Sequence, residues 1–237
     1  MQGACLSPRL PESPCPMSKR LSIDFVSDVS CPWCVIGLKG LQTALVRLEG
    51  EVEADIHFQP FELNPQMGAE GQDLDEHISQ KYGSTLDQMA QTREMIRARA
   101  AAVGFTMSAT GANGGKRRIY NTFDAHRLLH WAETQGPERQ LALKLALFEA
   151  YFTRGEAPSD TGVLLAAVAQ AGLDVEEARV LLAGERYAAE VREAEQLWLS
   201  RGIQSVPAVI VNGRYLISGG QPPEAYENAL KKIAEAT

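Results

Sequence analysis

The pattern of hydrophobic and polar positions at the start of the chain predicts a strand–helix–strand unit. Residues 21–27 (LSIDFVS) are short, apolar and rich in β-branched side chains, which is typical of a strand. From Cys34 to Leu48 the apolar positions fall three or four residues apart, which is the spacing of one helix face. The segment 53–63 (EADIHFQPFEL) then alternates again between apolar and polar positions. We therefore expect residues 21–60 to begin a parallel βαβ arrangement.

From about residue 64 to residue 185 the pattern changes to that of helices. Asp73 or Asp75 is expected to cap a short helix, and Thr85 a longer one that ends at Gly104. A glycine-rich loop follows at 105–118. Helices are expected near 74–82, 86–103, 122–135, 138–153, 160–171, 175–183 and 186–201, because glycine, proline and small polar residues separate these segments.

The C-terminal part returns to strands. Asn212-Gly213, between residues 208–211 and 215–217, is a strong signal for a tight hairpin turn. Pro222 and Pro223 are expected to open a final helix, since proline fits the first helical turn. The predicted order is thus strand, helix, strand, a helical block, helix, two strands and helix.

Length and charge limit the classes of function. The 237 residues suggest between one and two domains, and 45% hydrophobic composition is that of a globular protein. A formal net charge of -7, from 30 acidic and 23 basic residues, gives no reason to expect nucleic acid or an anionic membrane as a partner. No apolar run is long enough to span a membrane.

Residues 1–18 are predicted to form a disordered tail, because prolines and charges interrupt the segment. Two further interpretations remain: Met17 as the true start, or a functional tail that uses Cys5 and Cys15. The segment lacks the apolar run of a secretory signal. A cytoplasmic protein is therefore expected, and in a reducing compartment closely spaced cysteines are catalytic or metal-binding more often than structural.

Cys31-Pro32-Trp33-Cys34 lies where the first strand meets the first helix. Cys31 would stand at the helix N-terminus, where free N–H groups and the helix dipole favour its thiolate form. Cys34, one turn later, would lie on the same face and within reach of a disulfide. A zinc site would need a second cysteine pair, and two inert core cysteines are the other alternative. Dithiol–disulfide chemistry is the favoured interpretation.

Together with this motif, two further segments carry a resemblance to a known family. SDVSCPWCVIG (27–37), NTFDAHRLLHWA (121–132) and GIQSVPAVIVNGRYLISGGQPPE (202–224) resemble the DsbA-like thioredoxin-fold thiol oxidoreductases, and most closely their cytoplasmic FrnE-like branch. The resemblance covers residues 21–235. It implies an α/β protein with a thioredoxin fold (19–64 and 186–237) that carries a large, all-helical insertion (65–185).

The resemblance also implies roles for single residues. Cys31 becomes the attacking cysteine and Cys34 the resolving one, with Pro32 and Trp33 supporting them. Pro207 becomes a cis-proline that faces the disulfide and leaves the Val206 backbone free to pair with a substrate peptide. Without the resemblance, Val206-Pro207 would be an ordinary trans proline at the start of an edge strand. No bound cofactor is implied beyond the Cys31–Cys34 disulfide, with glutathione as a candidate co-substrate.

Several other residues are candidates with two interpretations each. Asp28 either opposes the Cys31 thiolate or shuttles its proton, or it only caps a turn. Asp24 lies near the position of the buried acid of thioredoxin-like proteins, one residue out of register. Asn121, His126 and Arg127 either touch substrate or pack between the two parts of the fold.

Two patterns suggest binding sites that we do not favour. His126 and His130 are four residues apart, but no third ligand is evident, so no metal is expected. The loop GANGGKRR (111–118) lacks the form of a phosphate-binding loop, and we expect a mobile loop there. A glutathione or anion contact through its basic residues remains open, and these residues are Lys116, Arg117 and Arg118.

These features favour a thiol–disulfide oxidoreductase that acts on a protein or a small molecule. The alternative is a glutathione-dependent isomerase or transferase, similar to kappa-class transferases and 2-hydroxychromene-2-carboxylate isomerases. Those relatives generally keep a serine at the first motif position, where this chain has Cys31. A binding or chaperone-like protein with an incidental cysteine pair is the third class. The sequence carries no signal for an oligomeric state.

Overall fold

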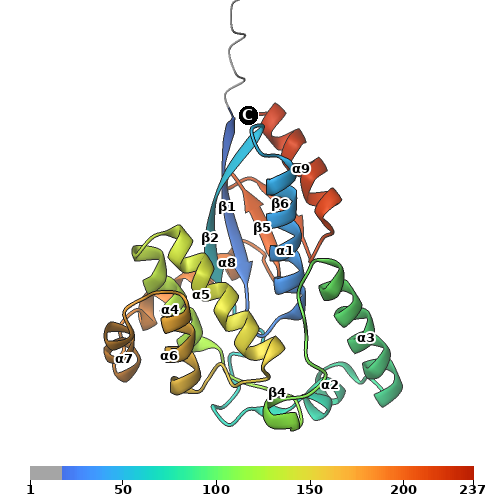
Figure 1. Ribbon diagram of the computed structural model, residues 1–237, viewed down its shortest axis with the longest axis vertical. Helices are drawn as coiled ribbons and strands as arrows, with labels where there is room; N and C mark the ends of the chain where they lie inside the picture. The colour runs from blue at the N-terminus through green and yellow to red at the C-terminus, as the bar shows by residue number, and fades with distance from the viewer. Residues whose placement is uncertain (1–17) are drawn as a thin grey trace, which may run out of the picture.

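A computed structural model describes residues 18–237, and its centre is a four-stranded sheet (Figure 1). The sheet has the order β2-β1-β5-β6. β1 (Lys19–Ser27) runs parallel to β2 (Val52–Pro60) and antiparallel to β5 (Ala208–Val211), which pairs with β6 (Tyr215–Ser218). The predicted parallel βαβ unit at the start of the chain is confirmed. The predicted hairpin is also confirmed, and its turn residues Asn212 and Gly213 both have positive φ.

Two helices cover one face of the sheet. α1 (Pro32–Arg47) and α9 (Pro223–Glu235) lie side by side on it (Figure 1). Alternate residues of β1, namely Leu21, Ile23 and Phe25, point into the core that these helices share with the sheet. Both motif cysteines belong to this core. The face of the sheet under α1 therefore determines the surroundings of the cysteine pair.

The opposite face is covered by α8 (Ala188–Ser200). Trp198 of α8 packs against Val26 of β1 and Ile210 of β5 in a separate, smaller core. These two strand residues lie on the other face from Phe25 because side chains alternate along a strand. The sheet is thus packed with helices on both faces, as a mostly buried sheet requires.

Between β2 and α8 the chain is mainly helical. α4 to α7 pack around a second core beside the sheet, while α2 and α3 lie on the other side, below α1 and α9 in Figure 1. Thr85 caps α3, as expected from the sequence, and the structure shows a reciprocal capping box with Gln88. The elements are α2 (Leu74–Tyr82), α3 (Leu86–Ala102), α4 (Phe123–Thr134), α5 (Pro137–Phe148), a π-helix η2 (Glu149–Thr153), α6 (Thr161–Gln170) and α7 (Val175–Ala183).

The structure corrects the expectation of an all-helical segment. β3 (Gln72–Asp73) and β4 (Arg118–Ile119) form a small antiparallel pair, and a 3-10 turn η1 (Ala112–Gly114) lies within the expected loop. Strands of two residues are too short to leave a periodic pattern in the sequence. The expected helix 138–153 is also divided, because its last five residues form the π-helix η2. The boundaries of the thioredoxin fold (19–64 and 186–237) and of the inserted segment (65–185) stay a prediction.

Cys5, Cys15 and Met17, with the tail expected at residues 1–18, fall outside the described residues apart from Ser18. Among residues 18–237, no helix has the length and apolar character needed to cross a membrane.

Candidate active site

Cys31 stands at the junction between β1 and α1. It is the N-cap residue of α1, and Pro32 occupies the first helical position, where a missing N–H has no cost. The Cys34 N–H donates to the Cys31 carbonyl over 3.1 Å, which closes the first turn. Both cysteines are free thiols, and both are buried: Cys31 is 3% exposed and Cys34 is 0% exposed. The predicted position of the pair at a helix N-terminus is therefore confirmed.

The turn that leads to Cys31 is fixed by Asp28, which is buried. One carboxylate oxygen accepts the N–H of Ser30 over 3.0 Å, and the other accepts the N–H of Leu63 over 2.7 Å. Burial opposes the charge on Asp28, but His126 and these two N–H groups outweigh it and hold the pKa of Asp28 below its usual value. Asp28 thus joins the turn before α1 to the segment that follows β2.

A second segment reaches Cys31 from the far end of the chain. The Cys31 Sγ lies 3.6 Å from the carbonyl oxygen of Val206, and the peptide bond between Val206 and Pro207 is cis. On α1, a Cβ added at Gly37 would lie only 3.0 Å from the Pro207 ring. Glycine at position 37 therefore lets α1 approach this proline closely.

Cys34 lies deeper than Cys31, and its environment disfavours the thiolate. Burial, followed by the neighbouring Cys31 sulfur, raises the pKa of Cys34 well above its usual value. The ammonium of Lys144, on α5, acts in the opposite direction. Burial in turn lowers the pKa of Lys144 to about 8.

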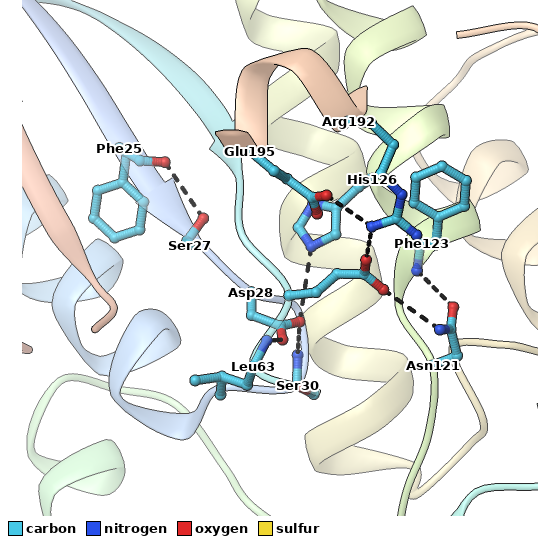
Figure 2. Close-up of polar contacts among 11 residues, drawn as sticks. Phe25, Ser27, Asp28, Ser30, Leu63, Asn121, Phe123, His126, Arg192 and Glu195 are labelled. Atoms are coloured by element: carbon cyan, nitrogen blue, oxygen red, sulfur yellow. Dashed lines mark hydrogen bonds and ion pairs between the residues drawn. The ribbon is translucent and has the colours of Figure 1, made fainter. Parts of the chain in front are cut away.

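A network of polar side chains continues from Asp28 into the helical part of the molecule (Figure 2). The His126 Nε2 lies 3.8 Å from Asp28, which is an ion-pair distance rather than a hydrogen bond. Farther along, Arg192 pairs with both Glu62 and Glu195, and its guanidinium stacks 3.8 Å above the ring of Phe123. Burial raises the pKa of Glu195.

Beside Cys31 there is a cavity of about 820 Å³. Cys31, Pro32, Trp33 and Val206 line it on one side. The opposite walls come from α2, α3, the segment 107–119 and the π-helix η2. Its apolar lining includes Met89, Ile96, Met107, Ile119, Tyr151 and Phe152. A cavity of this size next to a reactive thiol is suited to a small molecule or a short peptide segment.

The charges on the cavity wall differ in sign from the net charge of the chain. Its lysine and arginine side chains outnumber its single carboxylate, Glu62, which is already paired with Arg192. The chain as a whole carries a charge of -7. Arg93 pairs with Asp75 and Arg97 with Glu94, so Lys81 and Arg117 are the basic side chains of the wall that have no carboxylate partner among residues 18–237. The basic residues of the wall are Lys81, Arg93, Arg97 and Arg117.

The structure separates the candidates on α4 (His126 and Arg127) from Asn121, which precedes this helix. The Asn121 side chain donates to the carbonyl of Met67 over 3.1 Å and accepts the N–H of Phe123 over 2.9 Å. Arg127 is buried and donates to carbonyl oxygens of Leu181, Gly184 and Arg186, within the helical part. Neither these residues nor His126 line the cavity beside Cys31.

Asp24 does not reach the cysteines. It shares the sheet face of Val26, opposite Phe25, and accepts a hydrogen bond from Gln59 over 2.8 Å. Its position in the sequence suggested the buried acid of thioredoxin-like proteins, but the alternation of side chains along β1 points it away. The offset of one residue left the equivalence of Asp24 with that buried acid open, and the alternation along β1 decides against it.

Of the basic residues in the glycine-rich loop, only Arg117 lines the cavity. Its guanidinium lies 5.4 Å from the centre of the Tyr151 ring and 5.6 Å from that of Phe152. Lys116 is exposed beside Asp73, and Arg118 donates to the carbonyl of Glu70. Within residues 18–237, no group of three or more His, Cys, Asp or Glu side chains is arranged to hold a metal.

Sequence reasoning missed Lys144 and the pair of Glu62 with Arg192. Lys144 interrupts the apolar run LALKLALF (141–148), which is a signal for a buried lysine. Glu62 and Arg192 are 130 positions apart, and no local pattern connects them.

Helices on both faces of a β2-β1-β5-β6 sheet, a cysteine pair at the β1–α1 junction and a cis-proline beside it define a thioredoxin-type fold with additional helices. A family model for the DsbA-like thioredoxin domain matches residues 22–231. The chain belongs to this family, and its fold is that of the DsbA-like thiol oxidoreductases. Among curated proteins, no sequence matches this chain.

Solved structures agree with this assignment. A probable DsbA oxidoreductase from Streptomyces coelicolor is 30% identical, with a TM-score of 0.82 over 91% of this chain and 90% of that one. The cytosolic disulfide reductase DsbM from Pseudomonas aeruginosa, solved with GSH, is 16% identical, with a TM-score of 0.61 over 90% and 99%. A 2-hydroxychromene-2-carboxylate isomerase is 14% identical, with a TM-score of 0.64 over 91% and 97%. At these low identities, the similarity to the last two structures shows only that they and this chain have the same fold.

Proposed function

We propose that this protein is a thiol–disulfide oxidoreductase that works through Cys31 and Cys34. The observation that carries the proposal is the position of the Cys31 thiol, at the N-terminus of α1 and on the wall of a large cavity. The cavity gives a substrate room to approach the Cys31 sulfur, and the first N–H groups of α1, beside it, have no partner within the helix. Membership of the DsbA-like family supports the same reaction class.

The reaction proceeds in two displacements. The Cys31 thiolate attacks one sulfur of a substrate disulfide, and the other sulfur leaves as a thiolate. Cys34 then attacks the Cys31 sulfur of the mixed disulfide, which releases the second substrate thiolate and closes the Cys31–Cys34 disulfide. The enzyme is oxidised and the substrate is reduced. The oxidised enzyme runs the reverse reaction on dithiols.

The backbone around Val206 supports the binding step. Because the Val206 carbonyl lies 3.6 Å from Cys31 Sγ, a substrate sulfur that bonds to Cys31 arrives beside this backbone. An extended substrate segment could then pair with Val206, while Trp33 and Pro32 form the adjacent wall. In this proposal Asp28, with its two backbone hydrogen bonds, holds the turn that presents Cys31.

The Cys34→Ser variant tests the proposal, because it removes the second displacement and leaves the first intact. Mixed with a small disulfide, it should accumulate a mixed disulfide on Cys31 that intact-protein mass spectrometry detects. The Cys31→Ser variant is the matched control and should form no such adduct. If the folded Cys34→Ser protein gave no adduct, the proposal would be wrong.

The cavity supports a small, anionic disulfide as the substrate. Cys31 is only 3% exposed, so the disulfide of a folded protein would meet the cavity walls before it reached the sulfur. The basic wall favours a ligand with carboxylates, and oxidised glutathione has this chemistry. The structural neighbour DsbM was solved with GSH.

The absence of a serine at the first motif position weighs against a glutathione-dependent isomerase, although the fold resembles that of 2-hydroxychromene-2-carboxylate isomerase. A pair of free thiols is what redox turnover needs and what an isomerase does not use. We further propose the cytoplasmic FrnE-like branch as the place of this chain within the family, with residues 65–185 as an insertion into the thioredoxin fold.

A further inference from the structure

Arg117 differs from the other basic side chains on the wall of the cavity beside Cys31. Arg93 and Arg97 each pair with a carboxylate. The ammonium of Lys81 donates to a backbone carbonyl over 3.0 Å and to a side-chain oxygen over 2.8 Å. Arg117 also lines the cavity, but within residues 18–237 no carboxylate pairs with it. Its guanidinium is therefore placed to attract a ligand that brings the missing negative charge.

The Arg117 guanidinium has N–H donors to spare. An arginine carries five such donors in a planar fork. In the part of the chain that the structure describes, its side chain makes one hydrogen bond, from Nη1 to the carbonyl of Ser108 over 3.0 Å. The other N–H groups can bind a carboxylate, because its two oxygens match the geometry of the fork.

The two faces of the guanidinium, in contrast to its edges, already have neighbours. Its carbon lies 5.4 Å from the centre of the Tyr151 ring and 5.6 Å from that of Phe152. Aromatic faces attract a guanidinium and orient it without using its N–H donors. Burial raises the pKa of Tyr151 to about 12, so this phenol is uncharged at neutral pH and does not compensate the charge of Arg117.

The backbone at Arg117 is held on both sides. Its carbonyl accepts the N–H of Leu74, at the start of α2, over 3.0 Å. The next residue, Arg118, pairs with Asp73 in the β3–β4 ladder, and its carbonyl accepts the hydroxyl of Tyr151 over 3.0 Å. Arg117 is therefore positioned before a ligand arrives, which reduces the entropy that binding has to overcome.

The lining of the cavity near Arg117 is mainly apolar. Ile119 follows Arg117 in the same segment, and Met89 and Ile96 come from α3. The Cys31 thiol belongs to the wall that the β1–α1 junction forms. A ligand that reaches both Cys31 and Arg117 therefore needs a sulfur, an anionic group and an apolar body.

We propose that Arg117 determines substrate specificity by binding a carboxylate, and that the substrate is a small disulfide that combines this carboxylate with an apolar body. The Cys31 thiolate forms a bond to the sulfur of the half that Arg117 holds. The disulfide bond of the substrate breaks, and the other half leaves as a thiolate. Cys34 then displaces the bound half, so the enzyme dithiol supplies both electrons. This inference rests on the proposed function.

Two chromogenic aromatic disulfides test the role of Arg117. Dithiobis(nitrobenzoate) carries a carboxylate on each ring, whereas dithiodipyridine is uncharged at neutral pH. Stopped-flow absorbance gives the second-order rate constant for release of the first chromophore by the reduced protein. Arg117→Gln should lower this constant by about 10- to 100-fold for the carboxylated disulfide, because charge-assisted hydrogen bonds are lost. It should leave the constant for dithiodipyridine unchanged, since that substrate has no carboxylate.

Lys116→Gln is the matched control. It removes the same charge one position earlier, from an exposed side chain that does not line the cavity, and it should react with both disulfides at the wild-type rates. If Arg117→Gln slowed both disulfides equally or neither of them, or if Lys116→Gln had the same effect as Arg117→Gln, the role of Arg117 would be overturned. A wild-type protein that released no chromophore from either disulfide would instead overturn the proposed function itself.

Discussion

Asp28 shows how a single buried carboxylate can shape the turn that leads to Cys31. Its two oxygens each accept a backbone N–H, one from Ser30 before α1 and one from Leu63 after β2. The carboxylate is well suited to this position, because it offers acceptors on both sides and has no donor. The sequence allowed either a proton shuttle or a turn cap, and the observed contacts are those of a cap that also joins two segments.

We predict that Asp28→Asn destabilises the protein by about 2 kcal/mol at neutral pH. An amide has one acceptor oxygen, so its NH₂ group must face one of the two N–H donors. Urea denaturation of the variant and the wild type measures the difference.

The pH dependence of that difference has a definite sign. The pKa of Asp28 lies below its usual value in the folded protein, so its contribution to stability is present above a pH of about 4 and is lost as the pH falls through the folded-state pKa. The stability gap between wild type and Asp28→Asn should therefore narrow in acid. A gap that stayed constant down to strongly acidic pH would contradict this account.

Residue-scale prediction from the sequence succeeded where the signal was local. The position of the cysteine pair at a helix N-terminus could be predicted, because the strand pattern, the motif Cys31–Cys34 and the apolar helix face follow one another along the chain. The role of Asp24 stayed open in the sequence because it is one residue out of register with the family's buried acid, and the alternation along β1 decides its direction. Lys144 was missed although it interrupts an apolar run, because a lysine within such a run is buried only if the tertiary packing of α5 encloses it.

At the scale of elements, the same face of α1 packs closely against Pro207 and against the loop before α9. Gly37 and Gly40 form the contact surface of α1, and a Cβ at Gly40 would come within 2.7 Å of the carbonyl oxygen of Gln221. In the sequence these glycines look like weak points of the helix. In the structure they permit the close approach of two backbones.

Gly40→Ala should therefore destabilise the protein by about 2 kcal/mol, although alanine is the better helix former. The atom that it meets belongs to the backbone, so α1 or the loop has to shift. Thermal or urea unfolding measures the loss. Gly68→Ala is the control, because its added Cβ has no neighbour within 4 Å and should change stability by less than about 0.5 kcal/mol. Equal effects of the two substitutions would show that the close approach is unimportant.

The order of the helices and strands could largely be predicted from the sequence, but the contacts between elements far apart in the chain could not. Caps, glycines and the Asn212-Gly213 turn act within a few residues, so they can be found in the sequence. The pair β3–β4 has two residues in each strand, and its paired residues are 45 positions (Asp73 and Arg118) and 47 positions (Gln72 and Ile119) apart in the chain. Such contacts arise from the folded chain as a whole.

At the scale of the whole molecule, the site is built from two parts of the chain. The sheet and α1 supply the thiols and the Val206 backbone, while α2, α3, η2 and the segment 107–119 close the cavity around them. The helical segment therefore determines which substrates reach Cys31, and the charge on its cavity face is the property to test.

We predict that the reduced enzyme prefers anionic over cationic small disulfides. With oxidised glutathione as the anionic substrate and cystamine as the cationic one, the ratio of kcat/KM values should favour glutathione and should fall as salt is added, because salt screens the basic wall. Arg97 lines the cavity from α3, whereas Arg99, two positions later on the same helix, is exposed and does not line it. Arg97→Gln should lower the ratio several-fold and Arg99→Gln should leave it unchanged, as a coupled thiol assay would measure. Equal ratios in both variants, or a preference for cystamine in the wild type, would mean that the charge of the cavity does not select the substrate.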